Sequence, residues 1–195
     1  HASPQGLARG DDCHPASRRL QESESPIHRS AVERGTPVAS PMGFAIGVDH
    51  PKQEVNVGTL WRSAYAMGAG LLFTVGRRYE PSRQLGDTVK AYRHIPLLHF
   101  ETWDQYREHA PFAWVPIGIE IDRAAILLPE FHHPSEAVYI LGAEDHGLTN
   151  EAVALCKTLI VIPSRYCLNV AVAGSIVMYD RAVKKVKTQK SSGLP

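Results

Sequence analysis

The chain has 195 residues, which is enough for one domain with a full core and too few for two domains of ordinary size. Hydrophobic residues make up 44% and charged residues 21%, which excludes a disordered or fibrous chain. Because no apolar run approaches the length of a membrane span and no signal peptide opens the chain, we expect a cytoplasmic protein without a membrane partner.

The formal net charge of +1 excludes a protein that binds nucleic acid through its overall charge, so any RNA contact would depend on local basic patches. Two patches are present. One contains Arg77, Arg78, Arg83, Lys90 and Arg93, and the other, near the C-terminus, contains Arg181, Lys184, Lys185, Lys187 and Lys190. Either patch taken alone is equally compatible with an ordinary solvated surface.

Cysteine and histidine spacing argues against disulfides and metal sites. Cys13, Cys156 and Cys167 are odd in number and far apart, without a C-x-x-C pair. His132 and His133 are adjacent rather than spaced as helical metal ligands, so they predict a loop. We expect neither a disulfide framework nor a bound metal.

The ends of the chain predict disorder. Residues 1–40 are rich in Ser, Pro, Gly, Arg and Glu and lack apolar periodicity, so we interpret them as a disordered or artificially added tail. The expected folded domain covers residues 41–187, and residues 188–195 form a second disordered tail.

Between these ends, apolar runs alternate with helical patterns. Buried strands are predicted at 43–48, 71–75, 95–100, 115–121, 137–141 and 159–162. One helix is predicted to begin after Asn56, which would be its N-cap, and a second is predicted to begin after Thr102 and to end at His109. Two more are predicted from Thr149 or Asn150 to Cys156 and over 168–186. Because the strands are apolar throughout, they predict an α/β fold whose mostly parallel sheet is covered by helices on both faces.

Three segments at strand ends carry glycines and polar residues together, namely 56–64, 141–148 and 162–170. Open α/β sheets bind ligands at such ends. A dinucleotide-binding site is the obvious alternative, but no strand is followed by G-x-G-x-x-G at the start of a helix.

In this order and at this spacing, the three segments resemble the three motifs of the SpoU or TrmH-like branch of the SPOUT methyltransferases. The resemblance covers residues 42–187 and includes a terminal helix at 169–180. It implies an S-adenosylmethionine-dependent RNA 2′-O-ribose methyltransferase that forms a homodimer. It also implies a deep C-terminal trefoil knot, which general topology rules would not predict.

The resemblance also implies roles for individual residues. The catalytic set would be Arg62, Asn56, Glu144 and Asn169, and the S-adenosylmethionine contacts would be Glu120, Leu141, Gly142, Gly147, Ile162, Cys167 and Leu168. Because an arginine is effectively always protonated, we expect Arg62 to hold an RNA phosphate and stabilise the alkoxide rather than act as the base. Without the resemblance, Arg62 would be a solvated helix charge, Asn56 and Asn169 would be N-caps, and Glu144 would be an exposed acid in a turn.

One position departs from the family pattern, since many members carry serine where this chain has Cys167, a weaker hydrogen-bond donor. We expect structured RNA as the substrate, with tRNA favoured over rRNA. The first alternative is a non-catalytic RNA-binding or assembly module that keeps the SPOUT fold, and the second is another class of α/β nucleotide-binding enzyme.

Overall fold

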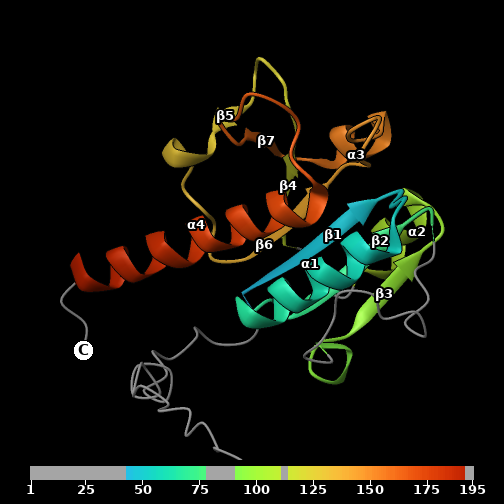
Figure 1. Ribbon diagram of the computed structural model, residues 1–195, viewed down its shortest axis with the longest axis horizontal. Coiled ribbons are helices and arrows are strands. Elements are labelled where there is room, and N and C mark those ends of the chain that lie inside the picture. Colours follow the sequence, from blue (N-terminus) through green and yellow to red (C-terminus); the bar gives the residue numbers. More distant parts are fainter. Residues whose placement is uncertain (1–42, 78–90, 111–113, 192–195) are drawn as a thin grey trace, which may run out of the picture. The chain divides into compact units, whose positions relative to one another are not determined.

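The computed structural model describes residues 43–77, 91–110 and 114–191. Within these ranges seven strands form one sheet in the order β3-β2-β1-β6-β4-β7-β5, and every neighbouring pair is parallel (Figure 1). The strands are β1 (Phe44–Asp49), β2 (Leu71–Val75), β3 (Leu97–Phe100), β4 (Val115–Ile119), β5 (Ile126–Leu127), β6 (Ala137–Leu141) and β7 (Thr158–Val161). The predicted parallel α/β fold is therefore confirmed.

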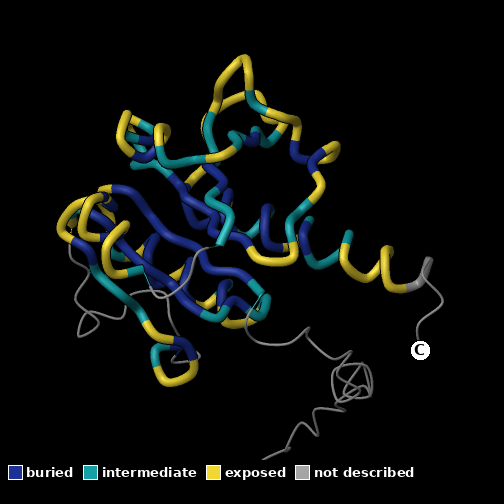
Figure 2. Tube along the Cα trace, turned by 180° about the vertical axis from the view of Figure 1, so that it is seen from behind, coloured by how far each residue is buried: buried dark blue, intermediate teal, exposed yellow. Residues whose placement is uncertain are grey.

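Helices cover both faces of this sheet. They are α1 (Glu54–Ala66), α2 (Trp103–His109), α3 (Asn150–Leu155) and α4 (Val170–Ser191), with 3-10 turns η2 (Ala91–Arg93) and η3 (Leu128–Glu130). One buried cluster joins α1 and α4 to the sheet, and a second cluster joins α2 and α3 to the opposite face. Figure 2 shows the sheet as the most buried part of the chain, which explains why its strands are apolar on both sides.

Several element boundaries differ from the sequence prediction. The helix α1 begins at Glu54 with Gln53 at the N-cap, so the prediction that Asn56 caps it is wrong. The predicted caps Thr102 and Thr149 are confirmed, because their side chains accept hydrogen bonds from backbone N–H groups of α2 and α3. The last helix spans Val170–Ser191, so it begins two residues later and ends five residues later than the predicted range 168–186.

Other predictions fall outside the described residues. These are the tail at 1–40, Cys13, and the basic residues Arg78, Arg83 and Lys90. The two-residue strand β5 and both 3-10 turns were not predicted, because such short elements carry no periodic signal. No described helix is both long enough and apolar enough to span a bilayer.

The order of the strands places a ligand-binding edge at the middle of the sheet. From β1 the chain moves outward through β2 to β3, and it then returns to β4 on the far side of β6. Such a reversal leaves a crevice at the carboxyl ends of the central strands, where open α/β sheets bind ligands.

A buried carboxylate at the end of β1 holds this edge together. Asp49 is fully buried and accepts hydrogen bonds from the Trp103 indole at 3.1 Å and from the Thr149 backbone N–H and hydroxyl at 2.8 and 2.7 Å. Because Trp103 opens α2 and Thr149 caps α3, one side chain fixes the start of both helices against the sheet.

Candidate active site

A cavity of about 260 Å³ lies at the carboxyl ends of β4, β6 and β7. Three stretches of chain build its walls: residues 119–121 after β4, 141–147 after β6, and the linker from β7 into α4. It is lined by Ile119, Glu120, Ile121, Leu141, Gly142, Ala143, Glu144, Asp145, His146, Gly147, Val161, Ile162, Ser164, Cys167, Leu168, Val170 and Ala173. Two of the three segments singled out in the sequence therefore meet at one cavity.

The turn after β6 depends on two glycines. Ala143 and Gly147 exchange backbone hydrogen bonds of 3.0 Å in both directions, which closes the turn into a small loop. Gly147 has φ +69°, a conformation that L side chains rarely adopt. A Cβ atom on Gly142 would overlap the backbone of Gly147 and Leu148, so this position has no room for a side chain.

The carboxylate of Glu120 braces this turn from the end of β4. One of its oxygens accepts a hydrogen bond from the Leu148 backbone N–H at 2.7 Å, and the other accepts from Ile121 at 2.8 Å. A Cβ atom on Gly147 would collide with the same carboxylate. Glu120 therefore lines the cavity and also fixes the shape of the opposite wall.

A chain of polar side chains joins the three sequence segments beside the cavity. The Asn169 amide donates to Asn56 Oδ1 at 2.9 Å, and the Asn56 amide donates to Glu144 Oε1 at 2.5 Å. Asn169 Oδ1 also accepts from the Ala171 backbone N–H at 2.9 Å, so Asn169 caps α4 as well. The second carboxylate oxygen of Glu144 is buried and has no hydrogen-bond partner within the described part of the chain.

Arg62 stands apart from this chain of contacts. It lies exposed on α1, on the same side of the helix as the exposed residues Val55 and Thr59, and it does not line the cavity. Within residues 43–77, 91–110 and 114–191 it makes no hydrogen bond or ion pair. The structure of one chain thus brings Asn56, Glu144 and Asn169 together and leaves the Arg62 guanidinium at the surface.

An ion pair joins the segment after β1 to the wall of the cavity. Lys52, which follows β1, contacts the carboxylate of Asp145 in the turn after β6. The hydrogen bond from Lys52, with a second one from His146, lowers the pKa of Asp145 to about 2. Because both partners are solvent-exposed, the pair positions the turn more than it stabilises the fold.

The two described cysteines differ in their surroundings. Cys167 is exposed and lines the cavity, whereas burial raises the pKa of the Cys156 thiol to about 12, so that it stays protonated. Among the residues that the structure describes, no group of three or more His, Cys, Asp or Glu side chains could hold a metal ion.

All seven residues predicted to contact the cofactor line this cavity, and so does Glu144. The roles of these residues stay predictions. Sequence reasoning missed the neighbouring wall residues Ile119, Ile121, Ala143, Asp145, His146, Val161, Ser164, Val170 and Ala173. Most of them adjoin predicted strand ends, which is the signal that could have found them.

The comparison with protein-family models supplies the family. The model of the "SpoU rRNA Methylase family" matches residues 43–179, which include every element from β1 to most of α4. The chain belongs to the SpoU rRNA Methylase family. The SpoU resemblance seen in the sequence is therefore confirmed.

Solved structures of SpoU proteins have the same fold. The SpoU methyltransferase AviRb from Streptomyces viridochromogenes, in complex with AdoMet, matches with a TM-score of 0.65 at 22% identity, over 77% of this chain and 64% of AviRb. The A. aeolicus TrmH/SpoU tRNA modifying enzyme matches with a TM-score of 0.64 at 19% identity, over 77% of this chain and 79% of that one. At these identities the likeness establishes the fold alone.

A further match is the structure described as "Structural insights into the 2-OH methylation of C/U34 on tRNA". Its TM-score is 0.66 at 21% identity, and the match covers 76% of this chain and 99% of that chain. No curated protein sequence matches the chain significantly. The chain spans less than two thirds of the length of AviRb.

Proposed function

We propose that this SpoU-family chain transfers a methyl group from S-adenosylmethionine to a ribose 2′-hydroxyl of structured RNA. The observation that carries the proposal is the hydrogen-bonded chain Asn169–Asn56–Glu144, which joins the three family motifs at the edge of one cavity. Residues from positions 56, 144 and 169 would have no structural need to meet there if each only capped a helix or faced solvent.

The cavity suits S-adenosylmethionine in shape and charge. Gly142 and Gly147 form a side-chain-free cradle where backbone groups can approach a ligand closely, and Ile162 and Leu168 offer apolar contact for an adenine ring. The free Glu144 oxygen leaves a carboxylate acceptor beside a ligand whose sulfonium is positively charged. When bound, S-adenosylmethionine supplies an electrophilic methyl group for an in-line displacement.

The chain's own task is then to align the ribose hydroxyl and stabilise the alkoxide that develops on it. We assign this task to Arg62, whose planar guanidinium can hold a phosphate by two hydrogen bonds. Its exposure leaves it accessible to RNA and to a second protein chain. Asn56, Glu144 and Asn169 position the walls around the reacting groups.

A homodimer would complete this arrangement. The outer side of α4 presents Val172, Ile176 and Tyr179 at helical spacing, and Val172 and Tyr179 are 48% and 62% exposed. Tyr166 and Leu168, in the linker that lines the cavity, are exposed as well. An apolar stripe of this kind is typical of an interface, and a partner docked there would lie beside the cavity. Tyr179→Glu is expected to convert the dimer to a monomer in light scattering.

The trefoil knot belongs to the same proposal. β7 lies beyond β4 in the sheet, yet α4 returns to pack against α1 and β6. The linker at 162–169 must therefore cross the carboxyl ends of the central strands, as a threaded chain would.

We favour tRNA over rRNA as the substrate. One of the solved structures compared above is described as concerning 2-OH methylation of C/U34 on tRNA, and the match covers 99% of its chain. The match covers only 64% of the chain of AviRb. A fold core shared over nearly the whole of that chain supports a similar way of presenting RNA to the cavity.

The experiment is an incubation of the protein with S-adenosylmethionine labelled in the methyl group and total RNA, followed by digestion to nucleosides. Label in 2′-O-methylnucleosides of the tRNA fraction is the expected result. Label in a methylated base would contradict the ribose assignment. Cofactor binding by calorimetry without any label would instead indicate a non-catalytic module that keeps the fold.

A further inference from the structure

A second cavity, of about 460 Å³, lies near the amino ends of the central strands, whereas the first lies at their carboxyl ends. It opens between the segment that precedes β6 and the C-terminal turns of α4. It is lined by Pro129, Glu130, Phe131, His132, His133, Pro134, Ser135, Arg181, Lys184, Lys185, Lys187 and Thr188. From Ser135 to Gly142 a strand advances roughly 23 Å at about 3.3 Å per residue, so the two cavities are well separated.

Two of its cations hold the cavity in shape. Arg181 is 6% exposed and donates to the carbonyls of Pro134 at 2.6 Å, Ser135 at 2.7 Å and Gly43 at 3.1 Å. Its guanidinium also lies over the Phe44 ring, 5.1 Å from the centroid. The buried guanidinium thus fastens the loop before β6 to α4 and to the start of β1.

Lys184 fixes the other side of the same loop. Its ammonium donates to the carbonyls of Leu128 at 2.6 Å and Phe131 at 3.0 Å, and it pairs with Asp180 at 2.6 Å. Because Arg181 and Lys184 bind carbonyl groups at both ends of the loop, the cavity has fixed walls before any ligand arrives.

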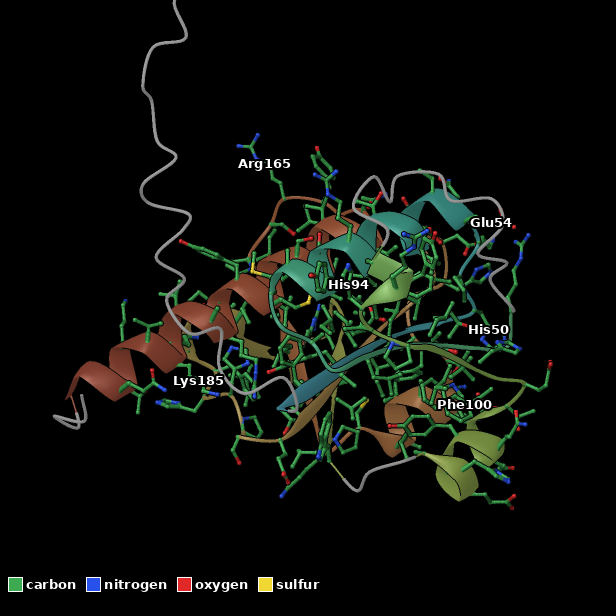
Figure 3. All side chains as sticks on the ribbon, turned by 90° about the horizontal axis from the view of Figure 1, so that it is seen from below. His50, Glu54, His94, Phe100, Arg165 and Lys185 are labelled. Atoms are coloured by element: carbon green, nitrogen blue, oxygen red, sulfur yellow. The ribbon has the colours of Figure 1, made fainter. Side chains whose placement is uncertain are left out.

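Two further cations on α4 are free to bind a ligand. Lys185 and Lys187 are exposed and line the cavity, and within the described ranges neither makes a hydrogen bond or ion pair. Among the residues that the structure describes, the cavity wall carries four cations and one acid, Glu130, with Asp180 and Glu136 beside it, which leaves an excess of positive charge. Figure 3 shows Lys185 near one end of α4 and Arg165, in the linker of the first cavity, near the other.

We propose that this second cavity binds the phosphodiester backbone of the RNA substrate, at a site distinct from the one that transfers the methyl group. The inference rests on the proposed function, because it takes RNA as the substrate. Two lysine ammoniums that line one preformed cavity match the negative charge of backbone phosphates and carry no means of reading bases.

The distance between the two cavities also indicates what length of RNA could contact both. Phosphates of one strand in a double helix advance about 3 Å along the axis per nucleotide, so a helical strand that reaches both cavities would extend over several nucleotides. Contact with Lys185 and Lys187 would therefore favour folded RNA over a short single-stranded oligonucleotide, without a contribution to the chemical step.

The test uses a double variant that carries both Lys185→Ala and Lys187→Ala. Its charge-matched control is a second double variant that carries Arg107→Ala and Lys157→Ala. Both control residues are exposed and lie outside both cavities. Affinity for a bulk tRNA preparation is measured by filter binding over a series of salt concentrations. We expect the double variant to bind about tenfold more weakly at low salt and to reduce the salt slope by roughly 1.5, since each phosphate contact contributes about 0.7 to 0.9.

Single-turnover methylation separates docking from chemistry. With saturating RNA, the double variant is expected to react within about threefold of the parent, while its kcat/KM falls in step with affinity. A thermal melt and calorimetry with S-adenosylmethionine check that both variants fold and keep the first cavity. Lys185→Glu with Lys187→Glu should weaken RNA binding further.

Unchanged affinity and salt slope in the double variant would overturn the second site while leaving the proposed function intact, provided that the parent methylates RNA. A reduced rate at saturating RNA with unchanged affinity would also overturn it, because the lysines would then act in the reaction. If the parent binds RNA but transfers no methyl group, the proposed function fails, and the binding series still decides whether the lysines hold RNA.

Discussion

The side-chain amide of Asn56 donates to Glu144 Oε1 at 2.5 Å, although 88 positions separate the two residues in sequence. The same Asn56 accepts a hydrogen bond from Asn169. Since Asn56 lies within α1, Glu144 follows β6 and Asn169 precedes α4, a single buried asparagine links three elements at the cavity. Loss of either partner leaves a polar group buried without a hydrogen bond, which costs about 1–3 kcal/mol.

We therefore predict that Asn56→Ala and Glu144→Ala act as one unit. Each should lower kcat/KM for methyl transfer by about tenfold or more, and the double variant should be little worse than the single ones. The coupling is expected to be roughly 1–2 kcal/mol. Thr59→Ala, on the exposed side of the same helix, is the control for additivity. Strictly additive effects of Asn56→Ala and Glu144→Ala would contradict a shared role.

A second prediction concerns the turn that the Glu120 carboxylate braces. Gly147→Ala places a Cβ atom against that carboxylate at a residue with φ +69°. We expect calorimetry to show that the variant binds S-adenosylmethionine at least tenfold more weakly, because the turn must shift to make room for the alanine side chain. Gly43→Ala, whose added Cβ would lie 3.3 Å from the nearest backbone oxygen, should retain affinity within about threefold.

The sequence predicted most of the elements and eight of the seventeen residues that line the first cavity, because strand ends and glycine-bearing turns leave a local signal. It misassigned Asn56 as an N-cap, since Asn before an apolar helix is a common cap. The actual N-cap, Gln53, lies three residues earlier, and the Asn56 side chain instead donates to Glu144 across the fold. A contact between residues so far apart in the sequence is invisible to local patterns.

The second cavity illustrates the same limit. The C-terminal basic patch was visible in the sequence as a run of positive charges, but the sequence does not show which of these residues have a structural role and which can bind a ligand. The fold divides them: Arg181 and Lys184 bind carbonyls of the loop before β6, whereas Lys185 and Lys187 face the cavity with free ammoniums. Only the position of that loop, set by tertiary packing, separates structural cations from those that can bind a ligand.

A third prediction tests the guanidinium of Arg62. Arg62→Lys keeps the positive charge and loses the planar fork, so kcat should fall by at least tenfold, about 1.4 kcal/mol, with S-adenosylmethionine affinity unchanged. Arg93→Lys, an exposed arginine of η2, is the matched control and should keep full turnover. Full activity of Arg62→Lys would remove Arg62 from the reaction.

A fourth prediction concerns the residue at which this chain departs from many SpoU proteins. Cys167 is exposed and lines the first cavity, so a serine hydroxyl there would be solvated rather than buried. We expect Cys167→Ser to retain the methyl-transfer rate within about tenfold, a barrier change of at most about 1.4 kcal/mol. Complete loss of turnover with intact S-adenosylmethionine binding would show that the thiol has a specific role.

The fifth prediction concerns His133, which lines the second cavity. His133, whose side chain is 4% exposed, donates from Nε2 to Asp180 at 2.8 Å and accepts at Nδ1 from the Tyr139 hydroxyl at 2.5 Å. Burial lowers the pKa of His133, and the hydrogen bond and charge of Asp180 oppose that effect without cancelling it. Burial also raises the pKa of Tyr139 to about 12, so its hydroxyl remains a donor at every pH of interest.

Because the folded pKa of His133 lies below the ordinary value of about 6.5, the unfolded chain binds the proton more readily. The associated stability is therefore complete above pH 6.5 and is lost as the pH falls below it, by about 1.4 kcal/mol for each unit of pKa depression. The free energy of unfolding is measured with urea at pH 7.5 and 5.5. It should fall less between these two pH values for His133→Gln than for the parent. His132→Gln, at the exposed neighbouring position, should behave like the parent, and an equal change in both variants would exclude His133 as the source.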